Sequence, residues 1–385
     1  MSTAENVEIA DSVTKIGDSA FTECERLKTV ELSDNVIEIG ASIFDDCTSL
    51  TSIRLPSGLK NIPNSMFAYC DNLETISLPN TLETIGASAF YDCYSLRNIT
   101  IPDTLTTIGT RAFEDCDSLT NIIIPQSVTS IGEEALAGCD NLTSVTFNTT
   151  SIEILPAGMF RGCVSLQTVQ LPSNLTTITR GAFNSCEKLS SIDLPSTLSV
   201  IDYNAFENCT SLRTIVIPGS VTVVGDRAFK GCTSLESATL YGKVKGDGFA
   251  KWGIFENCTS LKNVNLGAID DIEYEMFKGC TSLESIVIPS TVECIYSSAF
   301  ENCTSLTTVT INSQILYHIF DQAFYNCTKL KTVNIVNATT YFGKVHENAF
   351  MNIAQGSVIN VKSSYKSAFI AGTNYDSTLT SIVIK

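Results

Sequence analysis

Histidine, tryptophan and positive charge are scarce in this sequence. Its 385 residues include 2 His, 1 Trp and 24 Lys plus Arg against 41 Asp plus Glu, which gives a formal net charge of −17. Nucleic acid and anionic membranes repel so negative a chain, and we expect neither as a partner. With little imidazole and without the motifs of hydrolases, metalloproteases or phosphate-binding loops, we expect no catalytic residues, no metal site and no cofactor.

Long apolar runs are also missing. No stretch approaches the roughly 18 apolar residues that span a bilayer, and residues 1–8 have neither a basic start nor an apolar segment. We therefore expect no export signal, no membrane anchor and no membrane insertion, which leaves a cytoplasmic location open. Because 44% of the residues are hydrophobic, the apolar side chains must instead form a large core.

Cysteine, by contrast, is abundant and regularly spaced. Fourteen of the 15 cysteines recur, mostly at intervals of 23 residues, each three positions after a phenylalanine or, once, a leucine. These fourteen are Cys24, Cys47, Cys70, Cys93, Cys116, Cys139, Cys163, Cys186, Cys209, Cys232, Cys258, Cys280, Cys303 and Cys327. A repeat of this length predicts stacked coils that share one continuous core, rather than two or three separate globular domains.

The spacing of these cysteines favours a structural ladder of free thiols. Equivalent side chains of stacked coils run parallel to one another, which disfavours disulfides although a separation of about 4.8 Å would permit them. One cysteine per coil cannot surround a metal ion. In the last repeat Ile353 takes the place of cysteine, as a packing role predicts. Cys294 lies outside the series and is expected at the surface, as a tolerated thiol or a site of intermolecular disulfide formation.

Each repeat has two halves that predict different local structures. After the cysteine, Ser-Leu-x-x-Ile-x-Leu-Pro, as in residues 49–56, predicts a short strand ended by proline. The second half, as in residues 105–116, predicts a short extended segment, a glycine bend and one helical turn that carries Phe and Cys inward. The expected fold class is α/β, a solenoid of about 15 coils with a parallel inner β-sheet, and with extended segments and single helical turns on the outer side.

The consensus L-x-x-I-x-L-P-x-x-L-x-x-I-G-x-x-A-F-x-x-C resembles the repeat of the BspA-like leucine-rich repeat family over essentially the whole chain. We place the array at residues 1–353 and an atypical C-terminal repeat or cap at 354–385, within one continuous solenoid. The family comprises bacterial and protist surface proteins, many implicated in adhesion. The resemblance therefore implies a non-enzymatic binding scaffold that is secreted or at a cell surface. An intracellular protein-interaction scaffold is the alternative, because unpaired cysteines suit a reducing compartment.

Two surfaces are candidates for binding a protein or glycan ligand. We expect the chain itself to be a monomer. The first is a predicted concave face, formed by the residues five and seven positions after each cysteine, with the candidates Arg54, Asn98, Asn121, Gln170, Asp193, Asn263 and Asn265. The second is a bulge where the spacing becomes irregular, with the candidates Lys243, Lys245, Lys251 and Trp252. The alternatives are an ordinary solvated sheet and an insertion with Trp252 packed beneath it.

Acidic residues gather beside the predicted helical turn. Examples are Asp45, Asp46, Asp92, Glu114 and Asp115. We interpret them as a solvated rim that keeps the array soluble, because the loops of calcium-binding repeats are missing from the sequence.

Overall fold

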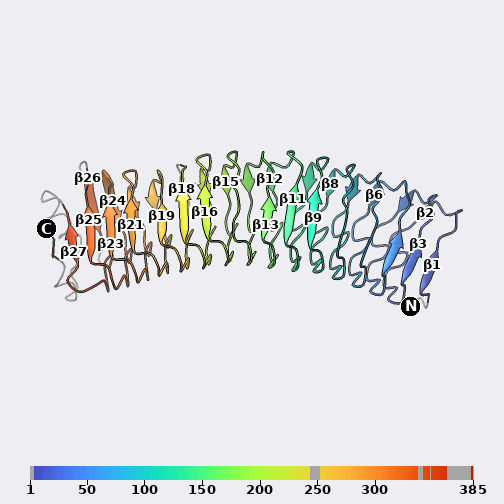
Figure 1. Cartoon of the computed structure of the whole chain (residues 1–385), viewed down its shortest axis with the longest axis horizontal. Coiled ribbons are helices and arrows are strands. Elements are labelled where there is room, and N and C mark those ends of the chain that lie inside the picture. The colour runs from blue at the N-terminus through green and yellow to red at the C-terminus, as the bar shows by residue number, and fades with distance from the viewer. Residues whose placement is uncertain (1–3, 243–251, 337–340, 347, 362–382, 385) are drawn as a thin grey trace. The chain divides into compact units, whose positions relative to one another are not determined.

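The structure is a computed structural model that describes residues 4–242, 252–336, 341–346, 348–361 and 383–384. These residues belong to two compact units, Met1–Pro195 and Ser196–Lys385. In each unit the chain winds in coils, and each coil adds one rung to three parallel stacks (Figure 1). We call these stacks ladder A, the strands that follow the cysteines; ladder B, the short strands that precede the glycine position; and ladder C, the turns that carry Phe-x-x-Cys.

Ladder A contains the longer strands. In the first unit they are β1 (Asn6–Glu8), β3 (Thr29–Glu31), β5 (Ser52–Arg54), β9 (Asn121–Ile124), β11 (Ser144–Phe147) and β13 (Thr168–Gln170). In the second unit they are β16 (Thr214–Ile217), β18 (Ser237–Leu240), β19 (Asn263–Asn265), β21 (Ser285–Ile288), β23 (Thr308–Ile311), β25 (Thr332–Ile335), β27 (Val358–Asn360) and β28 (Val383–Ile384). A single parallel bridge between Thr75 and Asn98 continues the ladder where no strand forms.

Ladder B consists mostly of strands of two residues. In the first unit they are β2 (Lys15–Ile16), β4 (Glu38–Ile39), β6 (Asn61–Ile62), β7 (Thr84–Ile85), β8 (Thr107–Ile108), β10 (Ser130–Ile131), β12 (Ile154–Leu155) and β14 (Thr177–Ile178). In the second unit they are β15 (Val200–Ile201), β17 (Val223–Val224), β20 (Asp271–Ile272), β22 (Cys294–Ile295), β24 (Ile315–Ile319) and β26 (Tyr341–Val345).

Parallel pairing in register places equivalent residues of successive coils on top of one another. Val7 lies opposite Val30 and Val30 opposite Ile53 in ladder A, and Thr84 lies opposite Thr107 in ladder B. The same register stacks the phenylalanines of ladder C into a buried column. The rings of Phe90 and Phe113 are parallel, with centroids 5.2 Å apart. The core is thus a set of identical columns, because the repeat brings the same side chain to the same place in each coil.

The structure confirms the solenoid of parallel sheets. The prediction of helical turns, which placed the fold in the α/β class, is wrong. The described residues contain no helix, and therefore none that could span a membrane. Most of these turns have two residues with positive φ, for example Ser88 at 53° and Asp92 at 61° on either side of Phe90. The N–H groups of these three residues donate to carbonyls of the following coil. Because they bond between coils, they cannot form the intrahelical bonds of an α-helix.

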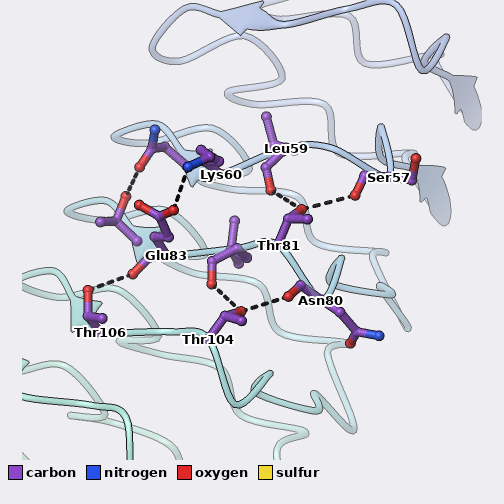
Figure 2. A network of polar contacts seen from close by, with 11 residues as sticks. Ser57, Leu59, Lys60, Asn80, Thr81, Glu83, Thr104 and Thr106 are labelled. Atoms are coloured by element: carbon purple, nitrogen blue, oxygen red, sulfur yellow. Dashed lines mark hydrogen bonds and ion pairs between the residues drawn. The ribbon is translucent and has the colours of Figure 1, made fainter.

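Threonine side chains fasten the coils beyond the strand-ending prolines (Figure 2). The Thr81 Oγ1 lies 2.9 Å from the carbonyl oxygens of both Ser57 and Leu59, in the preceding coil. Thr104 contacts Asn80 and Leu82 in the same way, at 2.9 and 2.8 Å. The Pro-x-Thr sequence therefore gives carbonyls a partner at the turn, where the proline itself supplies no donor.

Candidate functional site

The candidate binding residues of the predicted concave face lie on the outward side of ladder A, except Asp193, which stands at the equivalent position of a coil that forms no strand there. Arg54, Asn98, Asn121, Gln170 and Asp193 are exposed in the first unit. In the second unit Asn263 and Asn265 are exposed on β19. Because side chains alternate along a strand, the intervening Ile and Val residues point into the core and leave these polar groups to solvent. Each unit thus presents a row of hydrogen-bonding side chains along ladder A.

Arg54 is already engaged within the array. Its guanidinium donates to the Leu32 carbonyl at 2.9 Å and to Asp34 Oδ2 at 2.8 Å. The pKa of Asp34 is lowered because its carboxylate accepts hydrogen bonds from the Ser57 backbone and from Arg54. An arginine held in this way fastens two coils, and a ligand would have to compete with Asp34 for it.

Three exposed aliphatic residues on ladder A were not among the binding candidates predicted from the sequence. Ile123, Val216 and Val287 are 55%, 53% and 57% exposed, at the position seven residues after the cysteine. Their exposure could have been predicted from their place in the repeat, since polar residues fill most of the equivalent positions. Apolar side chains among hydrogen-bonding ones give this face the mixed character of many protein interfaces.

The bulge is only partly described. Lys243, Lys245 and Lys251 lie outside the described residues, and their predicted role stays a prediction. Trp252 is 43% exposed and stacks on Tyr274, with ring centroids 5.1 Å apart. It opens a row of stacked rings in the second unit that runs on through Tyr274, Tyr296, Phe320 and His346.

The cysteine ladder has a polar function that the sequence did not suggest. From Cys47 onwards, thiols of the series donate to the carbonyl of the anchor residue in the preceding coil. Cys93 donates in this way to Phe67 O at 3.1 Å, and Cys163 to the carbonyl of Leu136, the one anchor that is not phenylalanine. Burial raises the pKa of the Cys47 thiol to about 12 and that of Cys116 well above its usual value. These thiols therefore stay protonated and can donate, which an aliphatic side chain of similar size cannot do.

We expect native thiols to be almost unreactive. All 15 cysteines are free, and only Cys24 and Cys294 are partly accessible. A thiol-reactive chromophore should label at most these two residues in the folded chain, and all 15 in denaturant without reductant. The double variant Cys24→Ser/Cys294→Ser should remove the native labelling. If the number of thiols labelled in denaturant rises when reductant is added, the chain contains disulfides, and this would contradict the free-thiol ladder.

Cys294 lies between two other titratable side chains in ladder B. Its register partners are Asp271 on β20 and His318 on β24. Burial, followed by repulsion from Asp271, raises the pKa of Cys294 to about 11, and burial raises that of Asp271 to about 6. A thiol with a raised pKa is a poor nucleophile. Over the described part of the chain, no group of three or more His, Cys, Asp or Glu residues could hold a metal ion.

A proline opens a cleft in the first unit. In several coils a glycine N–H closes ladder B, as Gly86 does by donating to Ile62 O at 2.8 Å. Pro63 takes this position and has no N–H, and β4 and β6 belong to separate sheets. Between them lies a cleft of about 360 Å³, and Ile37 on its rim is 81% exposed.

Comparison with known families agrees with this architecture. The family model described as BspA type leucine rich repeat region, in 6 copies, matches residues 1–120, 106–236 and 251–375. The chain belongs to this family. Its members are built as repeat scaffolds, and the recurring residues described above are the ones that stack the coils. The match extends over both units, and it indicates no enzymatic family.

Two solved structures similar to this BspA-type chain are of bacterial leucine-rich repeat proteins. A leucine-rich repeat protein from Bacteroides ovatus is 30% identical, with a TM-score of 0.76, and the alignment covers 96% of this chain and 91% of that one. A leucine rich cell surface protein from Faecalibacterium prausnitzii is 26% identical over 89% of both chains, with a TM-score of 0.43. No curated protein matches the chain.

Proposed function

We propose that this BspA-type chain is a non-enzymatic scaffold that binds a protein or glycan through the outward side of ladder A. The observation that supports it most is the row of exposed side chains along that ladder in each unit. Asn and Gln amides can both donate and accept hydrogen bonds, and the aliphatic residues Ile123, Val216 and Val287 add apolar area. A face with few charges suits ligands recognised by shape and hydrogen bonding, such as glycans and neutral protein surfaces.

We propose a cell-surface or extracellular location, which the family expectation of adhesion supports, and a monomeric state. An intracellular interaction scaffold is the second candidate, and the free thiols favour it, because disulfides are rare in reducing compartments. The raised pKa values of Cys294 and of the buried thiols count against cysteine-based catalysis in either location.

A panel of matrix proteins and glycans, probed with the purified chain, tests this proposal. Any ligand found is then measured against a variant with three lysines on ladder A, Asn98→Lys/Asn121→Lys/Gln170→Lys. The matched control adds three lysines at exposed positions on or beside ladder B, Thr106→Lys/Ser130→Lys/Ile154→Lys. We expect the ladder A variant to lose about tenfold or more in affinity and the control to retain it. Equal affinities in the two variants would show that ladder A is not the binding face.

A further inference from the structure

Tyr69 and Tyr91 lie on ladder C of the first unit, and Tyr94 directly follows Cys93 at the end of the same turn. We call these three residues the tyrosine patch. Tyr69 and Tyr94 are each 44% exposed, and Tyr91 is partly buried. The rings of Tyr69 and Tyr91, from adjacent coils, meet edge to face with centroids 5.3 Å apart. Rings held in this way lose little freedom on binding, which is why exposed tyrosines are common anchors at interfaces.

The repeat itself does not require these residues. Tyr69 has φ of 57°, at a position where Asn208, Asn257 and Gly279 stand in the second unit. Glycine and asparagine tolerate this left-handed conformation best, whereas a large aromatic residue fits it poorly. The position of Tyr94 is likewise taken by threonine in other coils, as at Thr48. The backbone would be better served by other side chains, so the tyrosines need another explanation.

One ring of the patch already binds a guanidinium group. The Arg111 guanidinium carbon lies 4.9 Å from the ring centroid of Tyr91. The same guanidinium contacts the carboxylate of Glu114, the adjacent acidic residue of ladder C. The surface therefore shows, within the chain, how an arginine can stack on tyrosine and pair with a carboxylate at once.

Carboxylates surround the patch. Asp71, Asp92 and Asp117 flank Tyr94, and the pKa of its hydroxyl is raised to about 12 by a hydrogen bond to Asp92 and by the nearby negative charges. Burial and repulsion from Asp140, Asp115 and Asp92 raise the pKa of Asp117 to about 6. The negative charges of these groups repel one another, and a bound cation would reduce this repulsion.

Two arginines of this ladder are already engaged with other carboxylates. Arg111 and Arg161 are both paired with Glu114 and Glu134. In the second unit the position just before the cysteine is neutral, and amides pair there, with Asn326 Nδ2 donating to Asn302 Oδ1 at 2.7 Å. Exposed tyrosines beside aspartates that form no described ion pair are therefore a feature of these coils of the first unit rather than of the repeat.

We propose that the tyrosine patch, together with Asp71, Asp92 and Asp117, is a docking surface for an arginine-rich segment of a partner protein. Arginine fits both components of the surface, because its planar guanidinium stacks on tyrosine and bonds carboxylates with two N–H groups. Lysine would pair with the carboxylates but stack less well. This surface is separate from ladder A, and its function does not depend on a ligand bound there.

Titration calorimetry on the full chain tests the proposal with two synthetic peptides, Ac-Gly-Arg-Gly-Arg-Gly-Arg-Gly-NH₂ and its lysine counterpart. We expect saturable binding of one arginine peptide per chain, and about tenfold weaker binding of the lysine peptide. The variant Tyr69→Asn/Tyr94→Thr carries residues that other coils have at these positions, so it should fold, and it should lose about tenfold in affinity for the arginine peptide. Its control, Tyr203→Asn/Tyr241→Thr, alters two tyrosines, 42% and 66% exposed, outside the patch.

A second pair of variants separates the patch from the overall negative charge. Asp92→Asn/Asp117→Asn and Glu236→Gln/Glu284→Gln each remove two exposed or partly exposed carboxylates, but only the first pair borders the patch. We expect the first pair to weaken binding and the second to leave it unchanged. Equal affinity for both peptides, equal losses in patch and control variants, or no saturable binding would each overturn the proposal and leave only general attraction to a negative chain.

Discussion

Replacing Phe90 by alanine is expected to lower the free energy of unfolding by about 3–5 kcal/mol. The ring is fully buried and stacks on both neighbours, with centroids 5.3 Å from Phe67 and 5.2 Å from Phe113. Alanine would leave a cavity between two rings that cannot close, because the hydrogen bonds of ladder C fix the spacing of the coils. The loss of unfolding free energy should therefore fall at the upper end of the range for an aromatic core residue.

Chemical denaturation followed by circular dichroism measures this loss, with two controls. Phe90→Leu introduces the residue that stands naturally at Leu136 and should cost clearly less. Phe21→Ala removes a ring that is only partly buried and stacks on Phe44, in the first described coil. If all three variants lost the same free energy, the continuous column of rings would not be what stabilises the array.

Gly132→Ala is expected to cost about 1–3 kcal/mol, although it adds a single methyl group. A Cβ at Gly132 would lie 2.2 Å from the Thr110 nitrogen and 2.5 Å from the Thr110 Cα, in the preceding coil. These are backbone atoms, so no rotamer change can relieve the overlap. The coils would have to separate, which would strain the bond from the Gly132 N–H to Ile108 O, 2.8 Å long.

Gly17→Ala is the matched control, because Gly17 occupies the same position of the repeat four residues before its phenylalanine. A Cβ there meets nothing within 4 Å. We expect this variant to be neutral or to stabilise the chain by up to about 1 kcal/mol, since alanine restricts the unfolded state. Equal losses in the two variants would point to an intrinsic need for glycine rather than to the close approach of the preceding coil.

The same position shows where a repeat consensus stops predicting structure. Glycine is favoured at Gly86, Gly109 and Gly132, but Tyr296 and Phe320 stand there in the second unit. Both keep the bond to the preceding coil, at 2.8 Å, and their rings stack on each other with centroids 5.0 Å apart. In the sequence, each single departure from the consensus looks like an isolated irregularity. Only stacked coils show that several such substitutions form one aromatic row.

The error over the helical turn has a similar origin. Ala-Phe-x-x-Cys has the spacing of one turn of helix, and the sequence contains no proline there to oppose it. A single turn forms few hydrogen bonds of its own, so its conformation depends on its neighbours. In this chain the N–H groups of Ser88, Phe90 and Asp92 find carbonyls in the next coil, and the left-handed residues turn them in that direction.

The sequence by itself determined the repeat, the parallel stacking of coils, the buried columns of Phe, Leu and Cys, and the outward row of polar residues on ladder A. All of these follow from periodicity, because a residue type that recurs at a fixed interval must occupy equivalent places in a stack. Tertiary structure alone decided what lies between coils: the bonds from the thiols to the carbonyls of the preceding coil, the cleft beside Pro63, and the tyrosine patch with its carboxylates. These features join residues some 20 or more positions apart, and their distances and directions are defined only once the coils are stacked.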